Sequence, residues 1–317
     1  MRLDPVATGL VVGYAADQLF GDPRRAHPVS GFGRIATVLE GYTYAPRRRA
    51  GVVHEIALVG GALALGGGLS KLPHAVQVPV VAAATWTVLG GRSLAREARA
   101  MDALLQVGDL DGARSRVRNL VGRDPSNLDS SQLARACVES VAENTADAVV
   151  SPLFWGAVAG LPGLLGYRAV NTLDAMIGHR SRRYIEFGWG AARLDDLANW
   201  LPARVTVAST AIATGSLRGA RHTLAVVRRD APAHPSPNAG PVEAAFAAAL
   251  GRQLGGRNAY AGVLEERGRL GDGPPVSPED IASAVALQQR IGVIGLLGIV
   301  TARVLLRAAT RRTPRRR

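Results

Sequence analysis

Two residue types are almost absent from this chain of 317 residues. Cys137 is the only cysteine, which excludes an internal disulfide, a CxxC redox pair and a zinc site made of cysteines. Lys71 is the only lysine, and its setting, GLSKL, does not fit the GK[ST] end of a Walker A loop. Any nucleotide must therefore be held by arginines, backbone amides and Mg²⁺.

Aromatic residues are also scarce, at 5% of the chain, although 38 Lys and Arg against 25 Asp and Glu give a net charge of +13. Single-stranded nucleic acid usually binds to basic segments interleaved with stacking aromatics, and this pattern is missing. We therefore expect no nucleic-acid partner. A cleavable signal peptide is not expected either, because the first apolar run leads into GDP without a small-residue cleavage site.

Apolar residues, by contrast, make up 47% of the chain, and they gather in runs separated by arginine clusters. The runs lie near residues 5–20, 52–70, 76–91, 146–166, 200–216 and 291–306. This block pattern is typical of a membrane protein with basic cytoplasmic loops. The second and third runs predict a membrane-spanning helical hairpin with both ends cytoplasmic, because arginines flank it. Pro152 and Pro162 predict a broken helix in the fourth run.

The sequence thus predicts an all-α, polytopic helical membrane protein with cytoplasmic amphipathic helices and loops. We expect residues 1–317 to form a single integral-membrane domain. Within it, residues 92–145 are predicted to be a cytoplasmic helical insertion, and residues 309–317 a disordered basic tail. The expected location is the inner (cytoplasmic) membrane, with several passes.

The first two polar blocks each adjoin an apolar run. Asp17 lies inside such a run, where a carboxylate is costly unless it faces a cavity or a partner, and Asp22 follows in the turn. Glu139, Glu143 and Asp147 recur every fourth residue and therefore share one helix face. They form either a solvated acidic stripe or ligands for Mg²⁺, which takes one or two carboxylates together with substrate phosphates.

The third and fourth blocks combine more residue types. The third contains Arg168, Asn171, Asp174, His179, Arg180, Tyr184, Glu186, Arg193, Asp195, Asp196 and Asn199. Metal-assisted phosphoryl chemistry needs this combination, because metal ions bridge phosphate oxygens and guanidinium groups neutralise charge. A structural salt-bridge network would have a similar composition. The fourth block, residues 230–243, opens an alanine-rich helix whose start is either an anion site or an ordinary capped loop.

These blocks, in this order, resemble the CobD/CbiB family of cobalamin biosynthesis proteins. The matching stretches are GDPRRAHPV (21–29), ENTADAVVSPLFW (143–155), NTLDAMIGHR (171–180), LDDLANWLPAR (194–204) and HPSPNAGPVEAAFAAALG (234–251). The resemblance covers nearly the whole chain. It implies a membrane-bound ATP-dependent ligase of the adenosylcobinamide-phosphate synthase type. Such an enzyme joins a propionate of (adenosyl)cobyric acid to (R)-1-amino-2-propanol or its O-phosphate.

We combine this resemblance with the chemistry of the blocks to predict roles for single residues. The predicted metal ligands are Glu143, Asp147, Asp174, Asp195 and Asp196. The predicted substrate- or nucleotide-binding residues are Asp22, Asn144, Arg168, Asn171, Arg180, Ser236, Asn238 and Glu243. The predicted catalytic residues are His27, His179, His234 and Asp174, with a histidine taking the proton from the attacking ammonium.

ATP and Mg²⁺ are the predicted cofactors, and the corrinoid is a substrate. The predicted partners are these small molecules, the aminopropanol or its phosphate, and the lipid bilayer. Whether the chain forms a homo-oligomer stays open. The polar blocks are expected to converge into one pocket that faces the cytoplasm.

Two other functions stay open at this point. An intramembrane prenyltransferase would also pair acidic clusters with apolar helices, but Asp195-Asp196 is followed by Asn199 where a third aspartate would be expected. A small-molecule membrane transporter would explain broken helices, but it gives no reason for so many polar residues in the loops.

Overall fold

The structure is a computed structural model that describes residues 4–23, 27–121, 125–179, 181–260 and 263–312. Its secondary structure is almost wholly helical, with one two-stranded sheet in the described ranges, which confirms the predicted all-α class. The chain packs into two compact units. The first contains Met1–Arg92, Ser151–Asn199 and Leu296–Arg317, and the second contains Ser93–Val150 and Trp200–Gly295. The predicted single membrane domain with an insertion at 92–145 stays a prediction.

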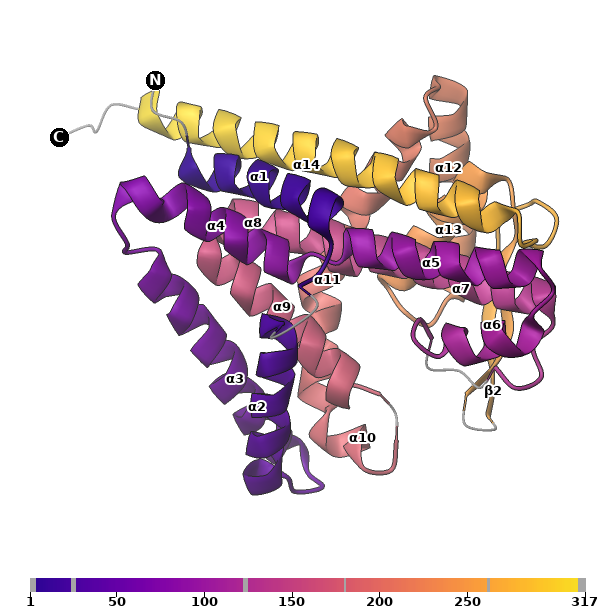
Figure 1. The fold of residues 1–317 in the computed structure, drawn as a ribbon, viewed down its shortest axis with the longest axis horizontal. Coiled ribbons are helices and arrows are strands. Elements are labelled where there is room, and N and C mark those ends of the chain that lie inside the picture. Colours follow the sequence, from indigo (N-terminus) through magenta and orange to yellow (C-terminus); the bar gives the residue numbers. More distant parts are fainter. Residues whose placement is uncertain (1–3, 24–26, 122–124, 180, 261–262, 313–317) are drawn as a thin grey trace. The chain divides into compact units, whose positions relative to one another are not determined.

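The helices of the first unit come from three stretches of the chain (Figure 1). They are α1 (Pro5–Phe20), α2 (Pro28–Thr43), α3 (Arg48–Leu69), α4 (His74–Val88), α8 (Ser151–Ala159), α9 (Leu161–Ile177) and α10 (Tyr184–Phe187). Two further helices, α11 (Trp189–Ala213) and α14 (Asp280–Arg312), have residues in both units. Because α14 is helical through Arg312, the predicted tail is helical over 309–312, and residues 313–317 lie outside the described part.

Close helix packing in the first unit depends on small residues. A Cβ at Gly9 of α1 would lie 2.5 Å from Val81 of α4, and one at Gly66 of α3 would lie 2.6 Å from Pro162 of α9. These glycines let α1 approach α4, and α3 approach α9, more closely than larger residues would allow. The second and third runs lie in two successive helical stretches long enough to cross a membrane, and the cytoplasmic ends of the predicted hairpin stay a prediction. Helices α3 and α4 have different main packing partners, α9 and α1.

The fourth apolar run is a broken helix, as predicted. The π-helix η1 (Ala146–Val150) leads into α8, which ends at Ala159. Gly160 then adopts φ 67, a left-handed backbone conformation that glycine tolerates, and Pro162 occupies the first turn of α9. The break lets α8 and α9 pack against each other.

Three helical stretches are long and apolar enough to cross a membrane: Arg48–Leu69, His74–Gln106 and Asp280–Thr310. They contain the second, third and sixth apolar runs. Helix α1 has 16 residues and α8 has nine, fewer than the ~20 that a straight span needs. The fold is therefore that of an all-α membrane protein.

The second unit surrounds the buried helix α7 (Ser130–Thr145). Its other elements are most of α5 (Gly91–Gln106), α6 (Leu110–Val117), η1, α12 (Leu217–Asp230), the 3-10 turn η2 (Ala231–Ala233), α13 (Ala239–Leu250) and the antiparallel strands β1 (Leu254–Tyr260) and β2 (Val263–Leu270). Helix α13 packs against α7 and α12. The hairpin of β1 and β2 is a departure from the purely helical expectation.

Candidate functional site

The first polar cluster lies between α9 and α11 within the first unit. We term it the α9–α11 cluster; it consists of Arg168, Asn171, Asp174, Asp195 and Asn199. The three residues on α9 are spaced three apart and so lie on one face, and the two on α11 are spaced four apart. Nη1 of Arg168 donates to Oδ1 of Asn171 (3.4 Å), and Nδ2 of Asn171 donates to Oδ1 of Asp195 (3.5 Å).

Asn199 holds Asp195 in place from the other side. Its amide is buried, and its Nδ2 donates to Oδ2 of Asp195 at 2.9 Å. Its Oδ1 accepts from the Ser151 hydroxyl at 2.7 Å and from the Tyr167 hydroxyl at 2.8 Å. Helices α8, α9 and α11 therefore all contribute to the orientation of one carboxylate, which is the kind of support that a preorganised site needs.

The two carboxylates of this cluster repel each other. Burial raises the pKa of Asp195 above its usual range, and the negative charge of Asp174 raises it further. Hydrogen bonds from Asn199 and Asn171 oppose this shift. Carboxylates forced together in a partly buried place share a proton or a cation.

A divalent cation fits this donor set. Mg²⁺ binds one or two carboxylates and completes its shell with water and phosphate oxygens, so Asp174 and Asp195 suit an ion that arrives with a phosphate. Within the described ranges, no group of three or more His, Cys, Asp or Glu side chains is placed to form a complete protein-only metal cage.

An apolar cavity of about 470 Å³ shares Arg168 with the cluster. Phe32 of α2 and Leu58 of α3 belong to its largely apolar lining, and Arg168 and Thr172 of α9 are among its few polar lining residues. The volume falls within the ~300–1,000 Å³ that is common for small-molecule pockets. The cavity thus places an apolar space next to the one guanidinium of the α9–α11 cluster.

A second polar cluster lies in the other unit, on α7, α13 and the loop before α13. We term it the α7–α13 cluster; it consists of Arg135, Glu139, Glu143, His234 and Glu243. Oε1 of Glu139 accepts the Gly255 amide at 2.9 Å and lies 3.7 Å from Nε of Arg135. Nε2 of His234 lies 3.7 Å from Oε1 of Glu243, and both side chains are 1% exposed.

The carboxylates of the acidic stripe predicted on α7 lie in different environments. Glu139 is buried and binds the backbone of β1, whereas Glu143 is open to solvent. Asn144 donates back to the Ser140 carbonyl at 3.0 Å, and Asp147 lies in η1. Glu143 is thus the member of the stripe best placed to meet a ligand.

The backbone amides at the start of α13 already donate hydrogen bonds to nearby residues of the same chain. Oγ of Ser236 accepts the amides of Asn238 (3.3 Å) and Ala239 (3.1 Å), and the Gly240 amide donates to the Ser236 carbonyl (3.3 Å). Arg204 donates to Oδ1 of Asn238 at 3.1 Å. The alternative of a capped loop therefore describes this local geometry better than an open anion site does.

The three candidate histidines differ in their surroundings. Nδ1 of His27 accepts the Val29 amide (3.2 Å), and Nδ1 of His234 accepts the Ser236 amide (3.1 Å). In the neutral ring this leaves the proton on Nε2, so neither Nε2 has a lone pair to accept another. His179 is exposed, and its ring packs edge-on against Tyr184 at 5.0 Å. It is the candidate whose ring is most accessible.

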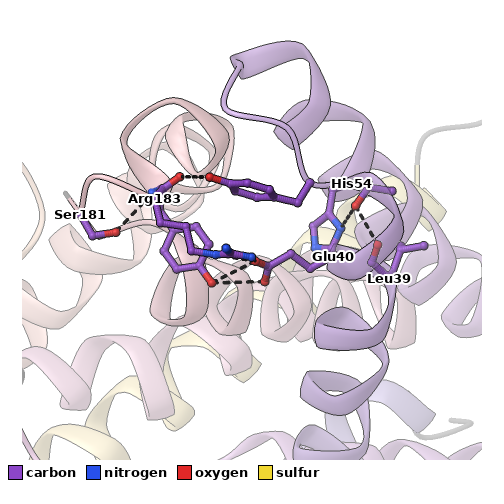
Figure 2. A network of polar contacts seen from close by, with 8 residues as sticks. Leu39, Glu40, His54, Ser181 and Arg183 are labelled. Atoms are coloured by element: carbon purple, nitrogen blue, oxygen red, sulfur yellow. Dashed lines mark hydrogen bonds and ion pairs between the residues drawn. The ribbon is translucent and has the colours of Figure 1, made fainter.

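Sequence reasoning missed a third set of polar residues, the α2–α3–α10 network, which consists of Glu40, Tyr44, His54, Arg183 and Tyr184 (Figure 2). The Arg183 guanidinium donates to Oε1 of Glu40 at 2.7 and 3.2 Å, and the Tyr184 hydroxyl donates to the same oxygen at 3.0 Å. Arg183 also lies 4.1 Å from the ring centroid of Tyr44, whose hydroxyl donates to the Arg183 carbonyl.

This network holds the segment between α9 and α11 against α2 and α3. His54 of α3 contacts the Thr43 hydroxyl at 2.9 Å, which extends the network to a third element. His179 belongs to the same segment, because it packs on Tyr184. The sequence signal for the network is weak, because Glu40 is the single acidic residue of α2 and its partners lie far away in the sequence.

The remaining predicted residues are placed as follows. Asp22 lies near Asp17, which is buried and accepts the Arg92 amide at 3.3 Å. Asp196 lies 3.9 Å from Arg193. Arg180 lies outside the described residues. The two named clusters belong to different units, so the predicted convergence of all blocks into one pocket stays a prediction, as do the individual roles.

These features define a class: an all-α membrane protein with a preorganised acidic and amide-containing site between its helices. The family model described as CobD/Cbib protein matches residues 10–288. A cobalamin biosynthesis protein CobD of Mycobacterium tuberculosis is 51% identical over 288 residues, covering 89% of this chain and 91% of the relative. The chain belongs to the CobD/CbiB family of cobalamin biosynthesis proteins.

Other relatives agree. A protein of the same name from Rhodobacter capsulatus is 42% identical over 314 residues, covering 93% of this chain and 97% of its own. One from Chromobacterium violaceum is 43% identical over 290 residues, covering 89% and 91%. No solved structure matches the chain.

Proposed function

We propose that this protein catalyses the ATP-dependent formation of an amide between (adenosyl)cobyric acid and (R)-1-amino-2-propanol or its O-phosphate. Membership of a cobalamin biosynthesis family supports the pathway. The observation that carries the chemistry is the pair Asp174 and Asp195, which lie beside Arg168 in a partly buried place. Such a pair is suited to a metal-bound phosphate.

The chemistry needs activation of the acid, because a carboxylate does not accept an amine at neutral pH. In the proposed first step, a carboxylate oxygen of the corrinoid attacks the γ-phosphorus of ATP, and ADP leaves. In the second step the amine nitrogen attacks the acyl carbon, the amide forms, and inorganic phosphate leaves. The net reaction consumes one acid, one amine and one ATP, and it yields one amide, ADP and phosphate.

Each residue of the α9–α11 cluster has a role in this scheme. Asp174 and Asp195 would hold Mg²⁺. The positive charge of this ion would offset the negative charge of the transferring phosphoryl group. Arg168 would bind phosphate oxygens through its guanidinium fork. Asn171 and Asn199 keep Asp195 in position through their hydrogen bonds. His179, with its exposed ring, would take the proton from the ammonium before it attacks.

The site is expected to face the cytoplasm, where ATP is present, and the protein is expected to lie in the inner membrane. The prenyltransferase and transporter hypotheses gain no specific support. A prenyltransferase needs two facing aspartate-rich motifs, and the α9 side of the cluster offers Asp174 with Asn171 and Arg168. The family's role in cobalamin biosynthesis favours a biosynthetic enzyme over a transporter.

The proposal is tested with the full chain in lipid nanodiscs, supplied with Mg·ATP, cobyric acid carrying ¹⁸O in its carboxylate, and either amine. We expect ADP release to require the acid, continued turnover to amide to require the amine as well, and one ¹⁸O atom to appear in the released phosphate. ADP release that does not depend on the acid, or phosphate free of ¹⁸O, would contradict the acyl phosphate step. The preferred amine is read from the product mass.

A further inference from the structure

A groove of about 510 Å³ runs between α3 and the first turns of α11 in the first unit. The two helices run in the same direction, because both are antiparallel to α9. Gly66 and Leu63 of α3 meet Pro162 and Gly166 of α9. Asp195 and Asn199 of α11 contact Asn171 and Tyr167 of α9. Arg48 lies over the Trp189 ring at 5.1 Å, Gly51 lies against the Phe187 carbonyl, and Glu55 lies against Gly190. Positions further along α3 therefore face positions further along α11, so the groove has a defined direction.

Glu55 is an unusual residue for this groove. It belongs to α3, which is long and apolar enough to cross a membrane, and it is only 5% exposed. Its buried Oε1 has no hydrogen-bond partner among the described residues. Its other oxygen occupies a notch at Gly190, where a Cβ would lie 2.6 Å away. A carboxylate in such apolar surroundings calls for a cationic partner.

The groove also contains a cation that does not contact Glu55. Arg193 lines it one turn further along α11 than Gly190 and forms an ion pair with Asp196 at 3.9 Å. Beyond Arg193 the lining is apolar, with Gly60 and Leu63 of α3 and Leu197 of α11. Leu197 is 72% exposed and Leu63 is 45% exposed, which is typical of a surface that faces lipid.

The order of these groups along the groove is carboxylate, guanidinium, apolar channel. A phospholipid with a primary ammonium headgroup has the complementary order: ammonium outermost, then phosphate, then acyl chains. Trp189 beside Glu55 and the arginines at the start of α3 mark the end of the groove that would lie at the membrane interface.

We propose that the α3–α11 groove is a binding site for an aminophospholipid of the phosphatidylethanolamine type. Its ammonium pairs with Glu55, its phosphate pairs with Arg193, and an acyl chain lies along Gly60, Leu63 and Leu197. The site is separate from the ligase chemistry, because it uses residues that the α9–α11 cluster does not.

The first test needs no variant. The full chain is reconstituted in nanodiscs containing equal amounts of phosphatidylethanolamine, its N-methyl and N,N-dimethyl derivatives, phosphatidylcholine and phosphatidylglycerol, and the lipids retained after detergent extraction are weighed by native mass spectrometry. We expect roughly tenfold enrichment of phosphatidylethanolamine over phosphatidylcholine, because a quaternary ammonium cannot donate hydrogen bonds to Glu55. Equal retention of the two, or preference for phosphatidylglycerol, would overturn the proposal.

A second arm separates the lipid from its headgroup. Free phosphoethanolamine at millimolar concentration is added during extraction. We expect it not to displace the retained lipid, because it lacks the acyl chain that fills the apolar channel. Displacement would show that the headgroup alone is the ligand and would overturn the assignment to a lipid.

Groove-filling variants give a matched pair. A Cβ at Gly60 and one at Gly68 both meet open space, so Gly60→Leu and Gly68→Leu should fold equally well. Only Gly60 lines the groove. We expect Gly60→Leu to lose most of the retained phosphatidylethanolamine and Gly68→Leu to keep it. Glu55→Gln and Arg193→Gln should each lower retention about tenfold, whereas Arg182→Gln, in the loop before α10, should not. Equal retention in Gly60→Leu and Gly68→Leu would contradict the site.

Discussion

The α9–α11 cluster and the α2–α3–α10 network are both polar, both partly buried, and both in the first unit, but their charges are arranged in opposite ways. In the network, the buried carboxylate of Glu40 meets the Arg183 guanidinium at 2.7 Å and a tyrosine hydroxyl as well. In the cluster, Asp195 is placed beside a second carboxylate, and its pKa is raised. One region is electrostatically satisfied, and the other is strained.

That difference separates the structural role of the network from the function that we propose for the cluster. A buried carboxylate with a cation and hydrogen-bond donors around it stabilises the contact between its helices. Two neighbouring carboxylates destabilise the fold in the absence of a cation, and such strain is characteristic of sites that bind charged ligands. Composition alone did not distinguish the two cases, because both regions contain acids, arginines and aromatic or amide side chains.

Asp195→Asn, which changes the α9–α11 cluster, should give the largest effect on the ligation rate. The ligation rate should fall about 100-fold, because one of two metal ligands is lost. The thermal midpoint in detergent should equal or exceed that of the wild type, because the repulsion with Asp174 is removed. Asp111→Asn, at a carboxylate whose side chain is 95% exposed, is the matched control. A wild-type rate in the properly inserted Asp195→Asn protein would refute the assigned role.

Arg168→Lys should have the next largest effect. The substitution keeps the positive charge but removes the planar fork that binds two phosphate oxygens at once. We expect the KM for ATP to rise about tenfold with a smaller change in kcat. Initial-rate kinetics at saturating acid and amine measure both constants. An unchanged KM together with a lower kcat would mean that Arg168 acts on a later step than nucleotide binding.

Glu40→Gln tests the α2–α3–α10 network and should affect stability more than the ligation rate. The protein loses charge-assisted hydrogen bonds from Arg183 and Tyr184, and the free energy of unfolding should fall by about 1–3 kcal/mol. The ligation rate of the folded fraction should fall far less than in Asp195→Asn. Thermal unfolding and single-turnover assays on the same preparation measure the two effects. A large rate loss with normal stability would place Glu40 in the chemistry and erase the distinction.

Tyr44→Phe should give the smallest effect and sharpen the picture of the network. It removes only the hydroxyl that donates to the Arg183 carbonyl at 3.1 Å and leaves the ring under the guanidinium. The free energy of unfolding should fall by about 0.5–1.5 kcal/mol. Tyr42→Phe, at a side chain that is 86% exposed, is the control and should be neutral. Equal stability of both variants would show that the Tyr44 hydrogen bond adds nothing.

Much of the fold could be predicted from the sequence, because its signals are local. The apolar runs at 52–70, 76–91 and 291–306 match the three membrane-length stretches, and Pro162 marks a real break. Packing partners could not be predicted in the same way. They depend on which glycine meets which helix, as Gly66 does with Pro162, and no single segment contains that information. The β1–β2 hairpin was not predicted, because neither LGGRNAY nor VLEERGRL has the strict alternation of apolar and polar residues that predicts a strand.

The site shows the same division between local and long-range information. The sequence analysis named Arg168, Asn171, Asp174, Asp195 and Asn199 in one polar block, and the structure brings them together between α9 and α11. The supporting contacts of Asn199 to Ser151 and Tyr167 span 48 and 32 residues and have no sequence signal. Glu40 and Arg183, 143 residues apart, were missed for the same reason.

The central claim is that Asp174 and Asp195 form a site for a metal-bound phosphate, and binding of Mn·ATP followed by electron paramagnetic resonance tests it most directly. The full chain in nanodiscs is titrated with Mn·ATP, and the wild type is compared with Asp195→Asn and Glu40→Gln. The account predicts saturable binding in the wild type and in Glu40→Gln, and at least roughly tenfold weaker binding in Asp195→Asn. Wild-type affinity in Asp195→Asn would contradict it.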